Sequence, residues 1–485
     1  MVIPLASQRA TASSKNYFGR YMYVRNILLV DVNGDGLDDL FVAPSFFDQY
    51  PVLPIEVWIN KGDGTFTNQT SSWIEGPVPT TTWSTALRTA DFNGDSRADI
   101  LIVQSGLEDK DCFDPGCDGS TNLLLLSQSN GKLKDVSSTH LAESQVAFRH
   151  VTTTLGDING DGHIDISFPR LGSPKQPADG VILLLNDGNG RFTRASDSAV
   201  PDEIEYLPYT AYGARPQTFD RQNVYSTALA DVDNDGRAEL LTASGGYGDR
   251  IGNDRTIRIF KWNLSSSSLS ETSRFEIAGP LKPIQNVGFP GANLPAPEHN
   301  GLGASHVSVG DVDGDRKADI VVAWESWTEN YAQVMRATGS GLYEDITIRG
   351  LGSYQTSYAS EGRSWTILEQ DLRDVNGDGR ADLSKGSSAN SASLLSSGSP
   401  AAAQINDGSG GFVKQKLFIE GKQVSEVEAQ VHVGCSACNF VTLYGRFVRP
   451  KDNRSTPDML LMSSEHQETP IPHDAAVTLR VFPAR

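Results

Sequence analysis

The 485-residue sequence contains no apolar run of the roughly 18–20 residues that a membrane-spanning helix needs. Its first residues, Met1 to Ser7, lack the charged and apolar segments of a signal peptide. We therefore expect no transmembrane segment, and either a signal that has been removed or a protein that stays inside the cell. With 41 basic residues against 60 acidic ones, the chain also lacks the electropositive surface of a nucleic-acid-binding protein.

Cysteine is scarce, and the four cysteines form two close pairs: Cys112 with Cys117, and Cys435 with Cys438. Two local disulfides are the main interpretation and would indicate an oxidising compartment. A four-cysteine zinc site and free thiols are the alternatives. The sequence also lacks a Ser–His–Asp order with a nucleophile elbow, a phosphate-binding loop and a His-x-x-x-His metal pair.

What the sequence does contain is a nine-residue acidic segment that occurs six times. We call these segments loops 1 to 6; they are residues 31–39, 91–99, 157–165, 231–239, 311–319 and 374–382. Oxygen-bearing side chains stand at positions 1, 3, 5 and 9 of each loop. Such a set can surround one hard cation, and position 7 adds a backbone carbonyl, so the expected ion is Ca²⁺.

The prediction is about six structural Ca²⁺ ions, because neighbouring carboxylates without a metal would repel one another. Ser96 and Arg316 stand at position 6, where glycine is preferred for a left-handed turn, so loops 2 and 5 are predicted to bind more weakly. The predicted ligands are Asp31, Asn33, Asp35, Leu37 and Asp39; Asp91, Asn93, Asp95, Arg97 and Asp99; Asp157, Asn159, Asp161, His163 and Asp165; Asp231, Asp233, Asp235, Arg237 and Glu239; Asp311, Asp313, Asp315, Lys317 and Asp319; and Asp374, Asn376, Asp378, Arg380 and Asp382.

Short apolar runs flank the acidic loops, as at residues 26–30 and 40–43 around loop 1, so each loop is predicted to be the turn of a β-hairpin. A second, glycine-rich turn follows several of the loops. It occurs at residues 60–66, 186–192 and 406–412, with weaker copies at 127–133 and 337–343. Two hairpins, and hence four strands, in every 60 to 80 residues are typical of one propeller blade.

Three further strands are predicted after loop 6, at residues 440–448, 458–462 and 475–482, and residues 2–5 supply a fourth. The predicted fold class is therefore all-β, a seven-bladed β-propeller closed by pairing of its N- and C-terminal strands. We expect a single domain over residues 1–485. Its blades are expected to begin near residues 20, 83, 149, 223, 304, 365 and 440, with residues 1–10 completing the last one.

The loops and their flanks resemble the FG-GAP/VCBS repeats of integrin α-subunit propellers and of many secreted microbial proteins. Phe18-Gly19 before loop 1 and Ala43-Pro44 after it match the FG and GAP parts, which most later repeats lack. The resemblance covers nearly the whole chain and implies an integrin-like, calcium-binding propeller that is secreted, on the cell surface or periplasmic. It implies less about activity, which has to be argued from a site.

Residues just before each first strand are expected to ring the channel mouth on the face opposite the acidic loops. The candidate catalytic residues there are Arg149, His150, Tyr225 and His306. A His or Tyr base beside an arginine that neutralises a carboxylate suits β-elimination from a sugar acid. Ligand binding without catalysis, or packing between blades, is the alternative role. The candidate ligand-binding residues are Tyr23, Trp83, Arg149, Tyr225, His306, Arg363 and Trp365, and His432 lies nearby.

The main functional prediction is an extracellular, calcium-stabilised propeller that binds a glycan or protein ligand on that face, because propellers of this repeat class include lectins. One alternative is a carbohydrate-active enzyme such as a polysaccharide lyase. Another is a non-enzymatic subunit of a surface or toxin assembly. Long segments such as 201–215 and 280–304 differ from repeat to repeat, which favours one composite site. The sequence predicts neither the ligand's identity nor the oligomeric state.

Overall fold

The structure is a computed structural model that describes the following parts of the chain. These are residues 2–3, 22–46, 53–81, 84–104, 121–141, 149–150, 152–171, 181–201, 224–244, 256–276, 303–325, 329–339, 342–351, 355–358, 370–373, 378–385, 404–409, 411–414, 417–419, 422–424, 438–445, 458–465 and 477–482. The predicted disulfide partners Cys112, Cys117 and Cys435 lie outside these ranges, and Cys438 is described only by its backbone.

The described residues form several small sheets, of which seven have four or five strands. Sheet 1 contains β2 (Met22–Val30), β3 (Asp39–Phe46), β5 (Glu56–Asn60) and β6 (Phe66–Asn68). Sheet 2 contains β9 (Ser84–Ala90), β10 (Asp99–Gln104), β11 (Leu123–Ser127), β12 (Leu133–Asp135) and β7 (Ile74–Glu75), which is parallel to β12. Sheet 3 contains β13 (Arg149–His150), β14 (Thr154–Gly156), β15 (Asp165–Leu171), β16 (Val181–Asn186) and β17 (Phe192–Arg194).

The remaining sheets continue this order along the chain. Sheet 4 contains β18 (Val224–Ala230), β19 (Glu239–Ser244), β20 (Thr256–Asn263) and β21 (Ser268–Glu276). Sheet 5 contains β22 (Gly303–Gly310), β23 (Asp319–Glu325), β24 (Glu329–Gly339), β25 (Leu342–Asp345) and β26 (Gln355–Tyr358). Sheet 6 contains β27 (Gln370–Arg373), β28 (Asp382–Lys385), β29 (Gln404–Asn406) and β30 (Phe412–Lys414). Sheet 7 contains β33 (Cys438–Gly445), β34 (Asp458–Glu465), β35 (Val477–Phe482) and β1 (Val2–Ile3).

Smaller elements complete the described structure. Two-stranded sheets pair β4 (Leu53–Pro54) with β8 (Thr80–Thr81), and β31 (Leu417–Ile419) with β32 (Lys422–Val424). The short helices are α1 (Thr70–Trp73), α2 (Ser137–His140), α3 (Thr347–Leu351) and the 3₁₀ turn η3 (Asp197–Ala199). None of the described helices is long and apolar enough to cross a membrane.

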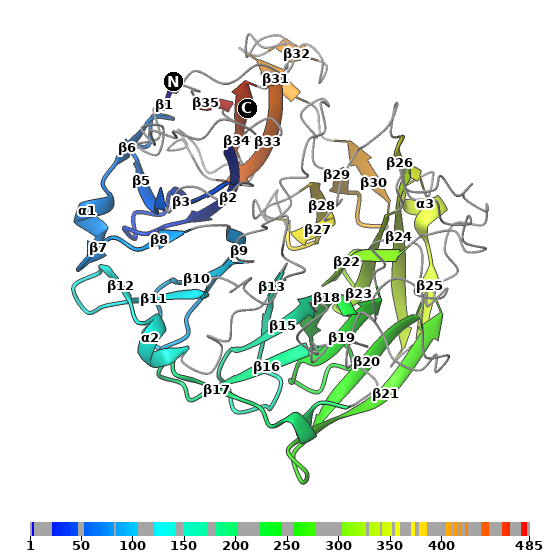
Figure 1. Ribbon diagram of the computed structural model, residues 1–485. Coiled ribbons are helices and arrows are strands. Elements are labelled where there is room, and N and C mark those ends of the chain that lie inside the picture. Colours follow the sequence, from blue (N-terminus) through cyan, green and yellow to red (C-terminus); the bar gives the residue numbers. More distant parts are fainter. Residues whose placement is uncertain are drawn as a thin grey trace, which may run out of the picture.

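The sheets stand around a common centre, with their first strands nearer to it than their last ones (Figure 1). Apolar clusters fill the spaces between consecutive sheets, from sheets 1 and 2 through to sheets 5 and 6. In β10, Ile100 and Ile102 pack toward sheet 1, while Leu101 and Val103 pack toward sheet 3. The second strands therefore read as continuous apolar runs because both of their faces are buried.

The strand pairing confirms the two predicted kinds of hairpin. Loops 1, 2, 4 and 5 each join a first strand to an antiparallel second strand, as in the pairing of Val30 with Asp39. The glycine-rich turns join the third strand to the fourth, as in the pairing of Asn186 with Phe192. The two weaker copies of this turn, after Ser127 and Ala337, pair in the same way.

The two ends of the chain meet in sheet 7. Val2 pairs with Thr478 and Ile3 with Val477, so β1 forms the outer strand beside β35 (Figure 1). The other strands of this sheet, β33 and β34, fall where the sequence predicted them. The N-terminal strand is thus held by the C-terminal one, as the sequence pattern predicted.

A short motif that the sequence reading missed fixes the outer edge of three sheets. A serine or threonine in the first turn of α1, α2 or α3 accepts a backbone N–H from the third strand, as Thr70 Oγ1 does from Val57 at 2.9 Å. The same hydroxyl donates to an Asn or Asp two residues earlier, as Thr70 does to Asn68 at 2.7 Å. The motif Asn/Asp-x-Ser/Thr is therefore a local turn that ties each outer strand to its neighbour.

Gly156 in β14 provides a test of the packing between sheets 3 and 4. A Cβ added there would lie 2.8 Å from the Cβ of Leu229 and 3.1 Å from that of Ala238. We expect Gly156→Ala to lower the free energy of unfolding by about 1–3 kcal/mol, because either sheet has to shift to accept the methyl group. Gly339→Ala is the matched control, since a Cβ at Gly339 meets nothing within 4 Å. Urea unfolding measures both variants, and equal losses would contradict this account.

Candidate functional site

The acidic loops are candidate metal sites, and loop 1 illustrates their geometry. The Asp31 carboxylate accepts the backbone N–H groups of Gly34 and Gly36, both at 2.7 Å, and of Asp35 at 3.0 Å. Gly34 and Gly36 have φ angles of 75° and 83°. These left-handed residues curl the backbone around the first carboxylate, which is why the repeat needs glycine at alternating positions.

Three loops place residues other than glycine in left-handed positions. Ser96 and Arg316, at position 6, have φ angles of 64° and 65°, so the predicted left-handed turn there is confirmed. Asn234, at position 4 of loop 4, has a φ angle of 60°. Left-handed conformations of this kind cost free energy for residues with a Cβ, although asparagine tolerates them better than most. The weaker ion binding predicted for loops 2 and 5 stays a prediction.

Position 9 joins loops 1, 2, 3, 5 and 6 to the third strand of the same sheet. Asp39 is fully buried; its Oδ2 accepts the N–H of Val32 at 3.0 Å, and its Oδ1 accepts the N–H of Asn60 at 2.8 Å. Asp99, Asp165 and Asp319 are held by the corresponding two hydrogen bonds at 2.7 to 3.1 Å. Position 9 is thus the innermost oxygen donor of each loop.

Burial changes the acidity of these carboxyl groups. Desolvation raises the pKa of Asp165 to about 7 and the pKa values of Asp39 and Asp319 to about 6, against the lowering effect of the hydrogen bonds. It also raises the pKa values of Asp99 and Glu239. Neighbouring carboxylates add to the effect at Asp39, Asp165 and Asp319. A bound cation would reverse this penalty, because it stabilises the charged form.

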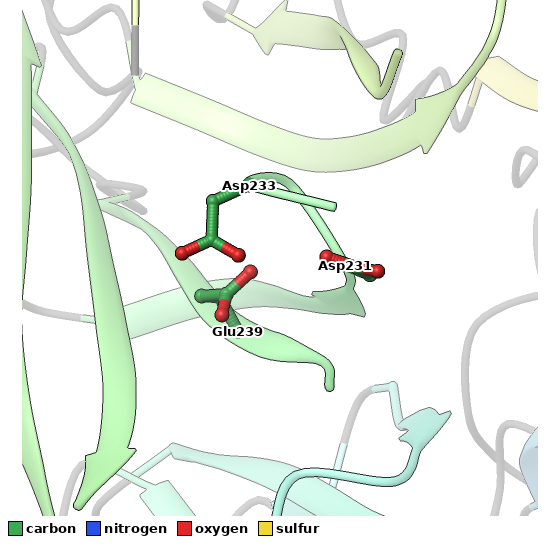
Figure 2. Close-up of side chains that lie close together, drawn as sticks. All are labelled: Asp231, Asp233 and Glu239. Atoms are coloured by element: carbon green, nitrogen blue, oxygen red, sulfur yellow. The ribbon is translucent and has the colours of Figure 1, made fainter. Parts of the chain in front are cut away.

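Among the described residues, two groups of carboxylates bring their oxygen atoms within 4.8 Å of one another. They are Asp231, Asp233 and Glu239 in loop 4, and Asp311, Asp313 and Asp315 in loop 5. In Figure 2 the carboxylates of Asp233 and Glu239 face each other, with Asp231 beside them. An oxygen-only donor set of this kind suits a hard divalent cation such as Ca²⁺. All of the predicted ligands except Asp374 and Asn376 lie in the described residues.

The sequence reading missed the basic side chains that contact these carboxylates. Position 7 was predicted to supply only a carbonyl, yet in four loops its side chain pairs with the acid at position 5. These pairs are Arg97–Asp95 at 3.1 Å, Arg237–Asp235 at 2.7 Å, Lys317–Asp315 at 2.6 Å and Arg380–Asp378 at 3.0 Å. The pairs are partly exposed and therefore contribute little to stability. Their signal in the sequence is the recurrence of Arg or Lys at position 7.

The loops also bind one another across neighbouring sheets. Ala238 of loop 4 donates its N–H to the carbonyl of Asp157 in loop 3 at 2.8 Å, and Ala381 donates likewise to Asp311 at 2.9 Å. The side-chain amide of Asn186 reaches the carbonyl of Phe92 in loop 2 at 2.9 Å. The acidic end of the sheets is thus a connected hydrogen-bonded layer.

The candidates for the opposite end lie where the first strands begin. Tyr23 is in β2, Arg149 and His150 make up β13, and Tyr225 is in β18; these four are described by their backbone only. His306 in β22 is 6% exposed, so its imidazole is nearly enclosed by the protein. Trp83, Arg363, Trp365 and His432 lie outside the described residues. The catalytic and ligand-binding roles of all these residues stay predictions.

A one-residue bulge recurs beside these positions, which sequence reasoning did not anticipate. In sheets 2, 4 and 5 the first strand contains one extra residue that has no partner in the second strand. This residue is Thr85 in sheet 2, Tyr225 in sheet 4 and Ser305 in sheet 5. Each of these lies six residues before its acidic loop. Sheets 1 and 3 gain one residue in the corresponding region, between Tyr23 and Asn26 and between His150 and Thr154. Such bulges redirect side chains and are common at the rims of β structures and beside active sites.

Comparison with known proteins bears on the class of this protein. Residues 31–102 match the family model described as an FG-GAP-like repeat, a range that covers loops 1 and 2. No curated protein sequence matches the chain.

Among solved structures, the chain is similar to the Dos1 propeller, with 9% identity and a TM-score of 0.31 over 64% of this chain and 55% of that one. It is also similar to rhamnogalacturonan lyase YesW, with 12% identity and a TM-score of 0.33 over 96% and 68% of the two chains. The chain is similar as well to exotype rhamnogalacturonan lyase YesX, with 13% identity and a TM-score of 0.32 over 79% of this chain and 73% of that one.

Residues 31–102 therefore contain an FG-GAP-like repeat, and the described chain is all-β, with several small antiparallel sheets built from a repeated pair of hairpins. The resemblance predicted from the sequence is therefore confirmed. The acidic groups in its loops have the chemistry to hold metal ions.

The raised pKa values predict that the metal-free protein loses stability as the pH rises. Native Asp39, Asp165 and Asp319 hold their protons up to a pH of about 6 to 7, whereas the ordinary value is 3.8. The native state therefore binds more protons in this window, and the free energy of unfolding should fall between pH 4 and pH 7. The slope is at most about 1.4 kcal/mol per pH unit for each titrating group.

Urea unfolding in the presence of a chelator, at several pH values in this window, measures the slope. Asp165→Asn is the informative control. Because an amide does not titrate, the slope of the free energy of unfolding against pH should be smaller by the contribution of one group. Metal-free protein that became more stable from pH 4 to pH 7 would overturn the assignment of these buried acids.

Proposed function

We propose that this protein is an extracellular, calcium-stabilised propeller that binds a glycan or protein ligand on the face opposite the acidic loops. The observation that carries the proposal is the difference between the two ends of the sheets. At the acidic end the polar groups are used internally, in hydrogen bonds within loops and between neighbouring loops. At the other end a bulge recurs among residues that differ from sheet to sheet.

The division of roles follows from the chemistry of each end. Side chains that already satisfy backbone donors and hold a cation cannot also adapt to a ligand, so the acidic loops serve the scaffold. The long segments 201–223 and 277–302 stand in the chain between the last strand of one sheet and the first strand of the next. Long connections on a rigid scaffold are common places for binding sites.

The number of blades and the closure of the ring are part of the proposal. Seven sheets of propeller type, with β1 paired to β35, support a seven-bladed ring in which the two ends of the chain share one blade. Closure of this kind would leave no blade with an unpaired terminus, which protects the sheet edges from aggregation.

The ligand is proposed to be a glycan or a protein bound at one composite site, since the rim residues are not repeated. Tyr23, Trp83, Tyr225 and Trp365 offer faces for stacking on sugars, and Arg149 and Arg363 offer charge for carboxylates. The enzymatic alternative uses Arg149, His150, Tyr225 and His306 to eliminate across a sugar-acid linkage.

Calcium removal tests the scaffold. With EGTA we expect the melting temperature to fall by several degrees, because ions that bind only the native state stabilise it by mass action. Excess Ca²⁺ should restore the original value, whereas Mg²⁺, which prefers a smaller octahedral site, should not. Differential scanning calorimetry measures this. An unchanged transition in protein shown to be metal-free would refute structural calcium.

A glycan array, with parallel incubation on uronic-acid polymers, tests the ligand. Binding that is weakened at least about tenfold by Arg149→Ala, a loss of about 1.4 kcal/mol, would support the proposed face. The control is Lys134→Ala, which changes an exposed lysine on β12. Absorbance of unsaturated products would favour the lyase alternative, and a ligand equally sensitive to both substitutions would contradict the placement of the site.

A further inference from the structure

Loop 4 differs from the other loops in the residue that faces its position 9 from the third strand. The pairing of Leu240 with Phe260 places the next residues, Glu239 and Lys261, opposite each other. The same step in sheet 5 places Arg336 opposite Asp319. In sheets 1, 2, 3 and 6 the corresponding residues are aliphatic: Ile59, Leu126, Leu185 and Ile405.

The two cationic residues occur in the same sheets as an additional carboxylate. Position 3 is Asp233 in loop 4 and Asp313 in loop 5, whereas the other four loops have asparagine there. At positions 1, 3, 5 and 9, a fourth acid thus appears only where the third strand supplies a positive charge. The acid at position 3 and the basic residue of the third strand are about 25 positions apart in the chain. Their joint occurrence therefore reflects contact in the fold and not local sequence.

Lys261 reaches into the middle of loop 4. Its Nζ lies 2.5 Å from Asp233 Oδ2, 2.6 Å from Asp235 Oδ2 and 3.5 Å from Glu239 Oε1. Asp233 and Asp235 lie at hydrogen-bonding distance from the ammonium, whereas Glu239 Oε1 forms an ion pair with it but accepts no hydrogen bond from the described residues. Two of these acids, Asp233 and Glu239, belong to the group that Figure 2 shows converging. The lysine nitrogen therefore stands where a cation shared by these oxygens would stand.

Loop 5 is arranged differently. Arg336 pairs at 2.6 Å with Glu344, which is outside the loop, and stays 3.6 Å from Asp313. Asp311, Asp313 and Asp315 keep their oxygen atoms together without a basic group from the third strand at hydrogen-bonding distance. Arg336 thus offsets the additional charge from the side, and within the loop the ammonium of Lys317 contacts Asp315.

We propose that the Lys261 ammonium is the resident cation of loop 4, in place of a divalent metal ion. This inference rests on the proposed calcium sites of the other loops and changes what is expected of this one. Both a bound Ca²⁺ and the ammonium require the oxygens of Asp233, Asp235 and Glu239, so loop 4 does not fit a metal ion while Lys261 is in position. A tethered cation cannot dissociate, and the hairpin between β18 and β19 therefore stays formed when calcium is removed.

Counting the bound ions tests the inference. Native mass spectrometry should find one more Ca²⁺ on Lys261→Ile than on the wild-type protein, because isoleucine is the residue found at this register in sheets 1 and 6. Arg336→Ile is the matched control and should leave the count unchanged. The melting temperature of Lys261→Ile should fall further below that of the wild-type protein in EGTA than in Ca²⁺.

The outcomes separate this inference from the proposed function. Equal ion counts for the wild-type protein and Lys261→Ile would overturn the inference while leaving calcium in the other loops. A wild-type protein that bound no Ca²⁺ at all would instead refute the calcium scaffold, and a single ion gained by Lys261→Ile would still support the role of the lysine.

Chemical labelling of the wild-type protein covers the case in which the variant does not fold. Lys261 should react with an acetylating reagent much more slowly than the exposed Lys134, whether Ca²⁺ or EGTA is present. A Lys261 that became reactive on addition of Ca²⁺ would show that the metal displaces it, which would overturn the proposal.

Discussion

The interaction on which this fold depends is the buried carboxylate at position 9 of each acidic loop. In loops 1, 2, 3 and 5 its two oxygens accept one N–H from the loop and one from the third strand, so a single side chain fixes both the hairpin and its register, as Asp39 does. A charge enclosed in this way is costly unless a cation or a proton accompanies it. The remaining acids of the loop have the chemistry to hold such a cation.

The same end of the sheets also carries much of the contact between repeats. The carbonyl of Asp157 accepts an N–H from the next loop, and Gly156, immediately before it, gives the next sheet room to approach. Each apolar cluster is shared by two consecutive sheets, so no sheet buries both of its faces alone. Because one repeat cannot be stable without its neighbours, the acidic layer has to stay uniform, whereas the opposite end is free to vary.

The sequence predicted the features that short segments encode. An acidic turn between two apolar runs, or a glycine-rich turn closing at Asn186 and Phe192, needs only local residues, and both hairpins are confirmed. The bulges were missed because they are a mismatch between two strands, and neither strand alone records it. One inserted residue moves every residue before it to the other face of the sheet. Counting alternate residues back from a loop therefore cannot predict the face on which Tyr23 or Arg149 lies. Their roles therefore stay predictions.

Lys261 was missed for the same physical reason, since its meaning comes from the register between β19 and β20. Taken alone, it is a surface lysine. Opposite Glu239 and beside Asp233, it offsets part of the negative charge of loop 4. A repeat protein offers an internal comparison here, because sheets with the same hairpins differ at one register position. Where that residue is aliphatic, the loop has three carboxylates at positions 1, 3, 5 and 9 and is proposed to bind an external cation. Where it is Lys261, a fourth carboxylate is present, and the chain itself provides the cation that the buried acid requires.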